Sequence, residues 1–264
     1  MKHIIVPIGS SENAANTLQY AIDLAQEIGA KVFVFRAYNV KEKAGTMVNI
    51  NSFMQHETKL YLRSVVMNVD TKGVDVKLIS AKGSVLTSIN AVNKELGIDL
   101  IVVGPKSNSV KEEVFLGKTS GSIVKKTEIP VLIVPKGYHF SPYKKSLIAF
   151  KSGIIYKKGV LKPLLTFLDV FKTTSNLLLI KTPGYKEEDL VLDAHLEAIK
   201  NKLTITENAT TYQGVLEHFQ SHSPDLLCVF RRKRGFFKKL WEKTVILKED
   251  FYCTIPLLVL SGNE

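Results

Sequence analysis

The chain has 264 residues, enough for one large domain or two small ones with buried cores. With 45% hydrophobic and 23% charged residues it is typical of a globular protein, and no apolar run approaches the ~18 to 20 residues that cross a bilayer. The net charge of +11 is shared between residues 1–140 and 141–264, which indicates solvated lysines rather than one large nucleic-acid surface.

The first part of the chain alternates between buried-strand and helix patterns. We expect strands at 3–8, 31–38, 74–80, 99–104 and 129–135. The first strand is a short apolar run followed by a helix cap, so we do not expect a signal peptide there. Strands that alternate with helices predict an α/β fold, in which a parallel sheet is covered on both faces.

Four helices are expected between these strands. The first begins after a cap at Ser10 or Ser11, and the second covers 53–69 with Leu60, Val65 and Val66 inward. The third runs from about Ser84 to Leu96, and the fourth covers 119–127. Gly29 and Gly97 follow the first and third helices, where a glycine commonly ends a helix.

The second part of the chain repeats this plan in a weaker form. We expect strands at 146–151, 176–182, 203–209, 225–230 and 255–260. The fourth and fifth strands match those of the first part at an offset of 126 residues, "DLIVVG" with "DLLCVF" and "IPVLIV" with "IPLLVL". The chain therefore reads as a tandem duplication with domains at 1–138 and 139–264, joined by the Pro- and Gly-containing linker 135–145.

The segment "GPKSNSVKEEVFLGKTSGS" (104–122) is the candidate ligand loop. In an open parallel sheet, ligands lie beyond the carboxyl ends of the strands, so the crevice is expected between "VPIGSS" and "VVGPKS". The helix that starts near Gly117 would offer backbone N–H groups to an anion, although the glycines could also simply make tight turns. The loop is not a P-loop, because Glu112 stands where that motif needs a glycine.

The layout resembles the universal stress proteins in their tandem two-domain form. The stretch "IIVPIGSSENAANTLQYAIDLAQEIGAKVFVF" is similar to the family's first strand, helix and second strand. The family's nucleotide loop has Gly, two residues, Gly, nine residues and Gly-Ser, and that spacing is kept by Gly104, Ser107, Gly117 and Lys118. The resemblance implies two Rossmann-like domains, each a five-stranded parallel sheet flanked by helices, and a stress-response binding or regulatory role.

The resemblance also implies a site for ATP or another adenine nucleotide in the first domain. Its residues would be Pro7, Ile8, Gly9, Ala37, Val103, Gly104, Lys106, Ser107, Gly117, Lys118, Thr119 and Ser120. Backbone N–H groups near Gly117 with Lys106 and Lys118 would hold the anion, and the base would lie near Ile8 and Ala37.

Three departures from the family pattern predict weakened or altered binding. Gly9 stands where ATP-binding members carry the acidic residue that contacts the sugar. Ser107 lacks the conformational freedom of glycine and brings a side chain toward the phosphate, and Lys118 replaces a compact hydroxyl. The second domain lacks the loop, and Lys151 follows its first strand in place of an acidic residue.

The basic segment 231–243 interleaves seven basic residues with Phe236, Phe237 and Trp241. Charge and stacking of this kind can bind RNA or single strands. The interpretation we favour is a surface helix whose aromatic side chains pack inward while its basic side chains stay in water, so we do not expect nucleic acid as a partner.

No catalytic or metal-binding constellation is found in the sequence. His218 and His222 have helical spacing but no nearby third ligand, and no nucleophile elbow is present. Cys228 and Cys253 lie in apolar runs and are expected to be reduced core thiols, which fits the cytoplasm.

The sequence therefore predicts a cytoplasmic binding protein with no metal of its own, rather than an enzyme. Two alternatives remain open, a weak ATP hydrolase and a binder of nucleic acid or an anionic partner through 231–243. The partners expected are a small anionic ligand and an internal pairing of 129–135 with 255–260, with no membrane. A homodimer is a further candidate assembly, although the sequence gives no specific signal for it.

Overall fold

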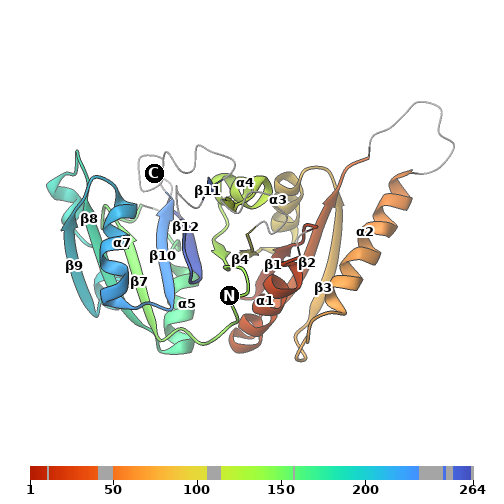
Figure 1. Ribbon diagram of the computed structural model, residues 1–264, viewed down its shortest axis with the longest axis horizontal. Coiled ribbons are helices and arrows are strands. Elements are labelled where there is room, and N and C mark those ends of the chain that lie inside the picture. The colour runs from red at the N-terminus through yellow and green to blue at the C-terminus, as the bar shows by residue number, and fades with distance from the viewer. Residues whose placement is uncertain are drawn as a thin grey trace.

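The computed structural model describes residues 1–10, 12–40, 50–105, 114–156, 158–231, 246–247 and 252–262, with backbone only at 114 and 246–247. Figure 1 shows the first half of the chain on the right, in red to yellow, and the second half on the left, in green to blue. A sheet runs through both halves, with β3 at one edge and β9 at the other (Figure 1).

The first half follows the predicted alternation of strands and helices. Its elements are β1 (His3–Pro7), α1 (Ala14–Ile28), β2 (Lys31–Tyr38), α2 (Ile50–Val66), β3 (Val76–Lys82), α3 (Val85–Leu96), β4 (Leu100–Val103), β5 (Val114–Leu116), α4 (Lys118–Lys126) and β6 (Val131–Ile133). The fold class predicted from the sequence, α/β with a parallel sheet, is confirmed.

The second half repeats the strand plan with shorter helices. Its elements are β7 (Lys145–Phe150), α5 (Lys162–Phe171), β8 (Thr174–Lys181), the 3₁₀ helix η1 (Glu187–Leu190), α6 (Ala194–Ile199), β9 (Lys202–Glu207), α7 (Thr211–His222), β10 (Leu226–Arg231), β11 (Ile246–Leu247) and β12 (Leu257–Ser261). The 17-residue α2 is matched here by the six-residue α6, so the second copy is shorter between its second and third strands.

The strands form one ten-stranded sheet in the order β3-β2-β1-β4-β6-β12-β10-β7-β8-β9. Every pairing within a half is parallel, and the order of the second half mirrors that of the first. The halves meet where β6 pairs antiparallel with β12, with Leu132 opposite Leu258. A second contact between the halves is the two-stranded ladder of β5 and β11.

Two local predictions were wrong. The first helix begins at Ala14 with Asn13 at its cap position, later than a cap at Ser10 or Ser11 would place it, and Ser11 lies outside the described residues. Leu60 is 42% exposed, whereas Leu62 is fully buried, because the inward face of α2 is set by Thr58, Leu62 and Val65. Gly29 and Gly97 end their helices in the left-handed conformation, as predicted.

Two apolar layers cover the sheet. One contains buried side chains of α1, α2, α5 and α6, and the other contains side chains of α3, α4 and α7. Each layer includes strand residues of both halves, so the core is continuous across the β6–β12 pairing. The core also holds Cys228 and Cys253, which are free thiols as predicted.

The connection between the halves is anchored by aromatic side chains. Tyr143 is buried, and its hydroxyl lies 2.6 Å from the hydroxyl of Tyr20 on α1. Phe140 packs edge-to-face against both rings. Burial, followed by the neighbouring tyrosine, raises the pKa of Tyr20, so this pair remains neutral in the folded protein.

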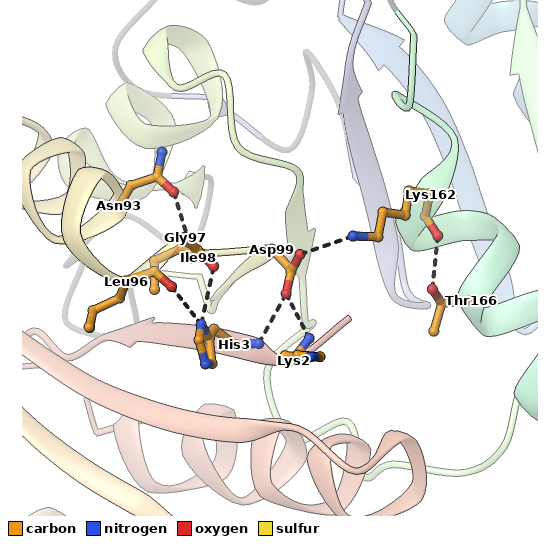
Figure 2. Close-up of polar contacts among 9 residues, drawn as sticks. All are labelled: Lys2, His3, Asn93, Leu96, Gly97, Ile98, Asp99, Lys162 and Thr166. Carbon is orange, nitrogen blue, oxygen red and sulfur yellow. Dashed lines mark hydrogen bonds and ion pairs between the residues drawn. The ribbon is translucent and has the colours of Figure 1, made fainter.

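In each half, the carboxylate of an aspartate just before the fourth strand accepts hydrogen bonds from two backbone amides. Asp99 accepts hydrogen bonds from the amides of Lys2, at 2.6 Å, and His3, at 3.1 Å. Figure 2 shows these bonds and the Lys162 ammonium, which approaches the same carboxylate from α5 of the second half at 3.7 Å. Asp225, 126 positions later, accepts from the amides of Lys144 and Lys145. The repeated carboxylate fixes the register of β1 against β4, and of β7 against β10.

Arg231 ties the end of β10 to the first half. Its guanidinium donates to the carbonyl oxygens of Lys125 and Thr127 and, at 3.1 Å, to the hydroxyl of Ser261. Glu128 lies 3.5 Å away, and the Arg231 side chain is only 13% exposed. The prediction that this residue is a solvated member of the basic segment was therefore wrong; positions 232–243 lie outside the described residues.

Candidate functional site

A cavity of about 380 Å³ lies at the carboxyl ends of β1, β2 and β4, beside the start of α4. This volume falls within the ~300 to 1,000 Å³ that is usual for small-molecule sites. Its lining comprises Pro7, Ile8, Gly9, Ser10, Asn13, Ala14, Thr17, Phe35, Arg36, Ala37, Val85, Val103, Gly104, Pro105, Gly117, Lys118, Thr119, Ser120 and Ile123. The cavity is therefore formed by the first half of the chain.

The structure brings together ten of the twelve residues that the sequence singled out. They are Pro7, Ile8, Gly9, Ala37, Val103, Gly104, Gly117, Lys118, Thr119 and Ser120. The other two, Lys106 and Ser107, lie outside the described residues. The ten come from four separate stretches of sequence, which only the parallel arrangement of β1, β2 and β4 can bring to one edge of the sheet.

Gly104 is required by close packing. A Cβ atom at this position would lie 2.2 Å from Thr17 Oγ1 and 2.9 Å from Asn13 Nδ2, both on the α1 side of the cavity. The Gly104 carbonyl in turn accepts a hydrogen bond from Ser120 Oγ, at 3.1 Å. The Ser120 hydroxyl therefore connects the first turn of α4 to the backbone that follows β4.

Gly9 is a glycine in open space. A Cβ atom there would meet none of the described residues within 4 Å, and its φ lies outside the left-handed region. Its carbonyl oxygen accepts a hydrogen bond from the hydroxyl of Tyr61 on α2, at 2.7 Å. The backbone at this corner of the cavity is therefore held from the helix side, and a side chain could be added without a clash.

The N-terminus of α4 supplies positive potential to the cavity. Gly117 is the cap residue, and the first turn contains Lys118 and no acidic residue. The first N–H groups of a helix have no intrahelical carbonyl partner, and the helix dipole adds a partial positive charge there. An anion placed against residues 117–119 would meet both.

The sequence did not point to several lining residues, of which Arg36 is the most informative. It is the charged residue in the interior of the strand "KVFVFRAY", which begins with Lys31, and its guanidinium carbon lies 3.9 Å from the centre of the Tyr61 ring. A cation in an otherwise apolar strand is a detectable signal, because buried strands of parallel sheets are nearly all apolar. Asn13 and Thr17 were missed because they lie at the N-cap and in the first turn of α1 and not on a strand end.

The second half carries a different arrangement at the corresponding place. Gly153 follows β7, its amide donates to the Asp189 carbonyl, and its own carbonyl accepts from the amide of Asp193. A Cβ atom on Gly153 would lie 2.4 Å from the Val191 carbonyl oxygen, so the segment around η1 packs directly on this loop. A second cavity, of about 490 Å³, lies beside α5 and has no sheet residue in its described lining.

Among the residues that the structure describes, no group of three or more His, Cys, Asp or Glu side chains is arranged to hold a metal ion. The rings of His218 and His222 lie edge-to-face with their centroids 6.2 Å apart, and His222 Nδ1 lies 2.8 Å from the His218 carbonyl oxygen. In the same described part of the chain, no helix is long and apolar enough to cross a membrane.

Comparison with known proteins points to one family. The sequence profile of the universal stress protein family matches residues 1–135. A universal stress protein of Methanocaldococcus jannaschii is 24% identical over 140 residues, which is 51% of this chain and 82% of that protein. Universal stress protein YxiE of Bacillus subtilis is 29% identical over 143 residues, covering 50% of this chain and 97% of that protein.

Solved structures extend the likeness of fold to nearly the whole chain. A universal stress protein from Archaeoglobus fulgidus superposes with a TM-score of 0.71 at 16% identity, covering 98% of both chains. A Pseudomonas aeruginosa protein, described as functionally unknown, superposes with a TM-score of 0.57 at 16% identity over 99% of this chain and 93% of its own. At these identities the likeness concerns the fold alone.

Proposed function

We propose that this chain, which belongs to the universal stress protein family, is a binding protein whose first-half cavity takes an adenine nucleotide. The observation that carries the proposal is the cavity itself, which joins an apolar wall to the N-terminus of α4. Its role would be regulatory, with the bound ligand reporting a cellular condition to a partner. The free buried thiols, Cys228 and Cys253, support a reducing compartment, and on that ground we propose a cytoplasmic location.

The lining of the cavity suits the two ends of a nucleotide. Ile8, Ala37 and Val103 offer an apolar surface to a base, and residues 117–119 offer amides and positive potential to a phosphate. No acidic side chain lines the cavity in the described part of the chain, so nothing there repels the phosphate.

The same lining favours binding over hydrolysis. Within the described residues it contains no carboxylate, imidazole or thiol that could act as a general base. Nucleotide affinity is expected to be modest, about micromolar or weaker, because Gly9 offers no side chain to the sugar.

Calorimetry with adenosine 5′-monophosphate and ATP tests the proposal. The variant Thr119→Asp places a carboxylate in the first turn of α4, where it suits the helix dipole but repels an anion. We expect binding by the wild-type protein and a loss of about tenfold or more in the variant. The matched control, Ser122→Asp, adds the same charge to α4 at a residue outside the cavity lining and should bind as the wild type does. No heat of binding from the folded wild-type protein would overturn the proposal.

A further inference from the structure

The cavity has two sources of positive charge, and they belong to different elements. Lys118 opens α4, while Arg36 lies near the end of β2. Both residues line the cavity, whose lining also includes the apolar residues Ile8, Ala37 and Ile123. A ligand with a single phosphate, bound at α4, would leave the charge of Arg36 without an anionic partner on the ligand.

Tyr61 links the guanidinium of Arg36 to the backbone of Gly9. The guanidinium lies over the ring of Tyr61, and the hydroxyl of that same ring donates to the Gly9 carbonyl. Gly9 has open space where a side chain would be, so no residue that the structure describes fills this corner of the cavity. The stacking on Tyr61 also holds the guanidinium plane in place.

Arg36 has unused hydrogen-bonding capacity in this position. Its Nη1 atom is buried and has no hydrogen-bond partner within the described part of the chain. Ser80 Oγ is also buried without a hydrogen-bond partner in that part of the chain, and Ser80 pairs with Arg36 in the β2–β3 register. A buried guanidinium donor without an acceptor is destabilising, and a cation in this state favours an anionic group bound nearby in the cavity.

We infer that the ligand carries two anionic groups, and that Arg36 selects the second of them. This inference rests on the proposed function. With the 5′-phosphate at α4 and the base on the apolar wall, the ribose would face the Gly9 corner. The structure therefore points to a nucleoside bisphosphate, with its second phosphate on the 2′ or 3′ oxygen of the ribose. In dinucleotide-binding folds, likewise, an acidic residue suits a free ribose hydroxyl and an arginine suits a ribose phosphate.

The test compares adenosine 5′-monophosphate with adenosine 2′,5′-bisphosphate and adenosine 3′,5′-bisphosphate by calorimetry on the full chain. We expect the wild-type protein to bind one of the bisphosphates about tenfold or more tightly than the monophosphate, as a charge-assisted hydrogen bond would give. Arg36→Gln should abolish this preference, so that the bisphosphates and the monophosphate bind with similar affinity. Arg63→Gln removes the same charge from exposed α2, outside the cavity lining, and should keep the preference.

A second variant tests the inference independently, in case Arg36→Gln does not fold. Gly9→Asp fits the open space and would place a carboxylate beside the guanidinium, so it should also abolish the preference for bisphosphate. Circular dichroism would establish that both variants are folded.

The outcomes separate the inference from the proposed function. Equal affinity of the wild-type protein for all three ligands would overturn the inference and leave nucleotide binding in place. A preference that survives in both Arg36→Gln and Gly9→Asp, or one that is also lost in Arg63→Gln, would likewise overturn it. An absence of binding to any of the three would overturn both.

Discussion

Two glycines at the cavity are there for opposite physical reasons. Gly104 has no room for a side chain, because α1 approaches it through Thr17 and Asn13. Gly9 has room to spare, and its backbone φ does not require glycine. The sequence alone shows both as glycines after apolar strands and cannot distinguish them, because the difference depends on how α1 packs.

Gly104→Ala should therefore destabilise the fold, while Gly9→Ala serves as its matched control. The added methyl group would overlap Thr17 Oγ1, and overpacking of this kind typically costs about 1–3 kcal/mol of unfolding free energy. Gly9→Ala should change the unfolding free energy by less than about 0.5 kcal/mol. Urea denaturation measures both; equal effects would contradict this account of Gly104.

Asp99 provides a pH-dependent contribution to stability. Burial by itself would raise the pKa of Asp99, but the backbone hydrogen bonds from Lys2 and His3 and the nearby Lys162 outweigh it, so the pKa is lowered. A lowered folded-state pKa gives stability that is fully present above the unfolded value, about 3.9, and is lost as pH falls through the folded value.

Asp99→Asn should accordingly lower the unfolding free energy at pH 7 by about 1–3 kcal/mol. The difference from the wild type should shrink as pH falls below about 4, because the wild-type carboxyl then becomes neutral as well. Denaturation curves at several pH values measure this. A difference that is constant from pH 7 to the acid limit would show that the charge of Asp99 is not involved.

At the scale of elements, the positions of most strands could be predicted from the sequence, whereas the contacts between the halves could not. Buried runs such as "DLIVVG" and "IPLLVL" reveal their strands through apolar continuity, and Gly97 reveals the end of α3. The ladder of β5 with β11 joins segments far apart in sequence, and these strands of three and two residues are too short to be recognised from the sequence. Likewise, "RRKR" reads as a solvated run, and only the tertiary structure shows that its first arginine lies against α4.

Arg231→Met should weaken the attachment of β10 to the first half. The substitution would leave the carbonyls of Lys125 and Thr127 and the carboxylate of Glu128 without their cationic partner. We expect a loss of about 1–3 kcal/mol in unfolding free energy, by the usual cost of unpaired, partly buried acceptors. Arg63→Met, on the exposed face of α2, is the control and should be near neutral. A neutral Arg231→Met would mean that solvent replaces these bonds at no cost.

At the scale of the whole molecule, the halves share one sheet and one core. Each apolar layer contains residues from both halves, and the antiparallel pairing of β6 with β12 joins the two parallel sets of strands. The described part of the cavity, in contrast, belongs to the first half alone. The second half therefore supplies packing to the fold, while the predicted ligand chemistry is concentrated in the first.

This shared core predicts a single cooperative unfolding transition for the full chain. In scanning calorimetry, the van't Hoff and calorimetric enthalpies should agree. Two resolved transitions would mean that the β6–β12 pairing and the common layers do not couple the halves.

The central claim is that the first-half cavity holds an adenine nucleotide, and photolabelling with an 8-azidoadenosine nucleotide followed by peptide mapping tests it most directly. The azide on the base should label residues near Ile8 and Ala37 on the apolar wall, and excess unmodified nucleotide should suppress the label. Label confined to residues 139–264, or label that unmodified nucleotide fails to suppress, would contradict the claim.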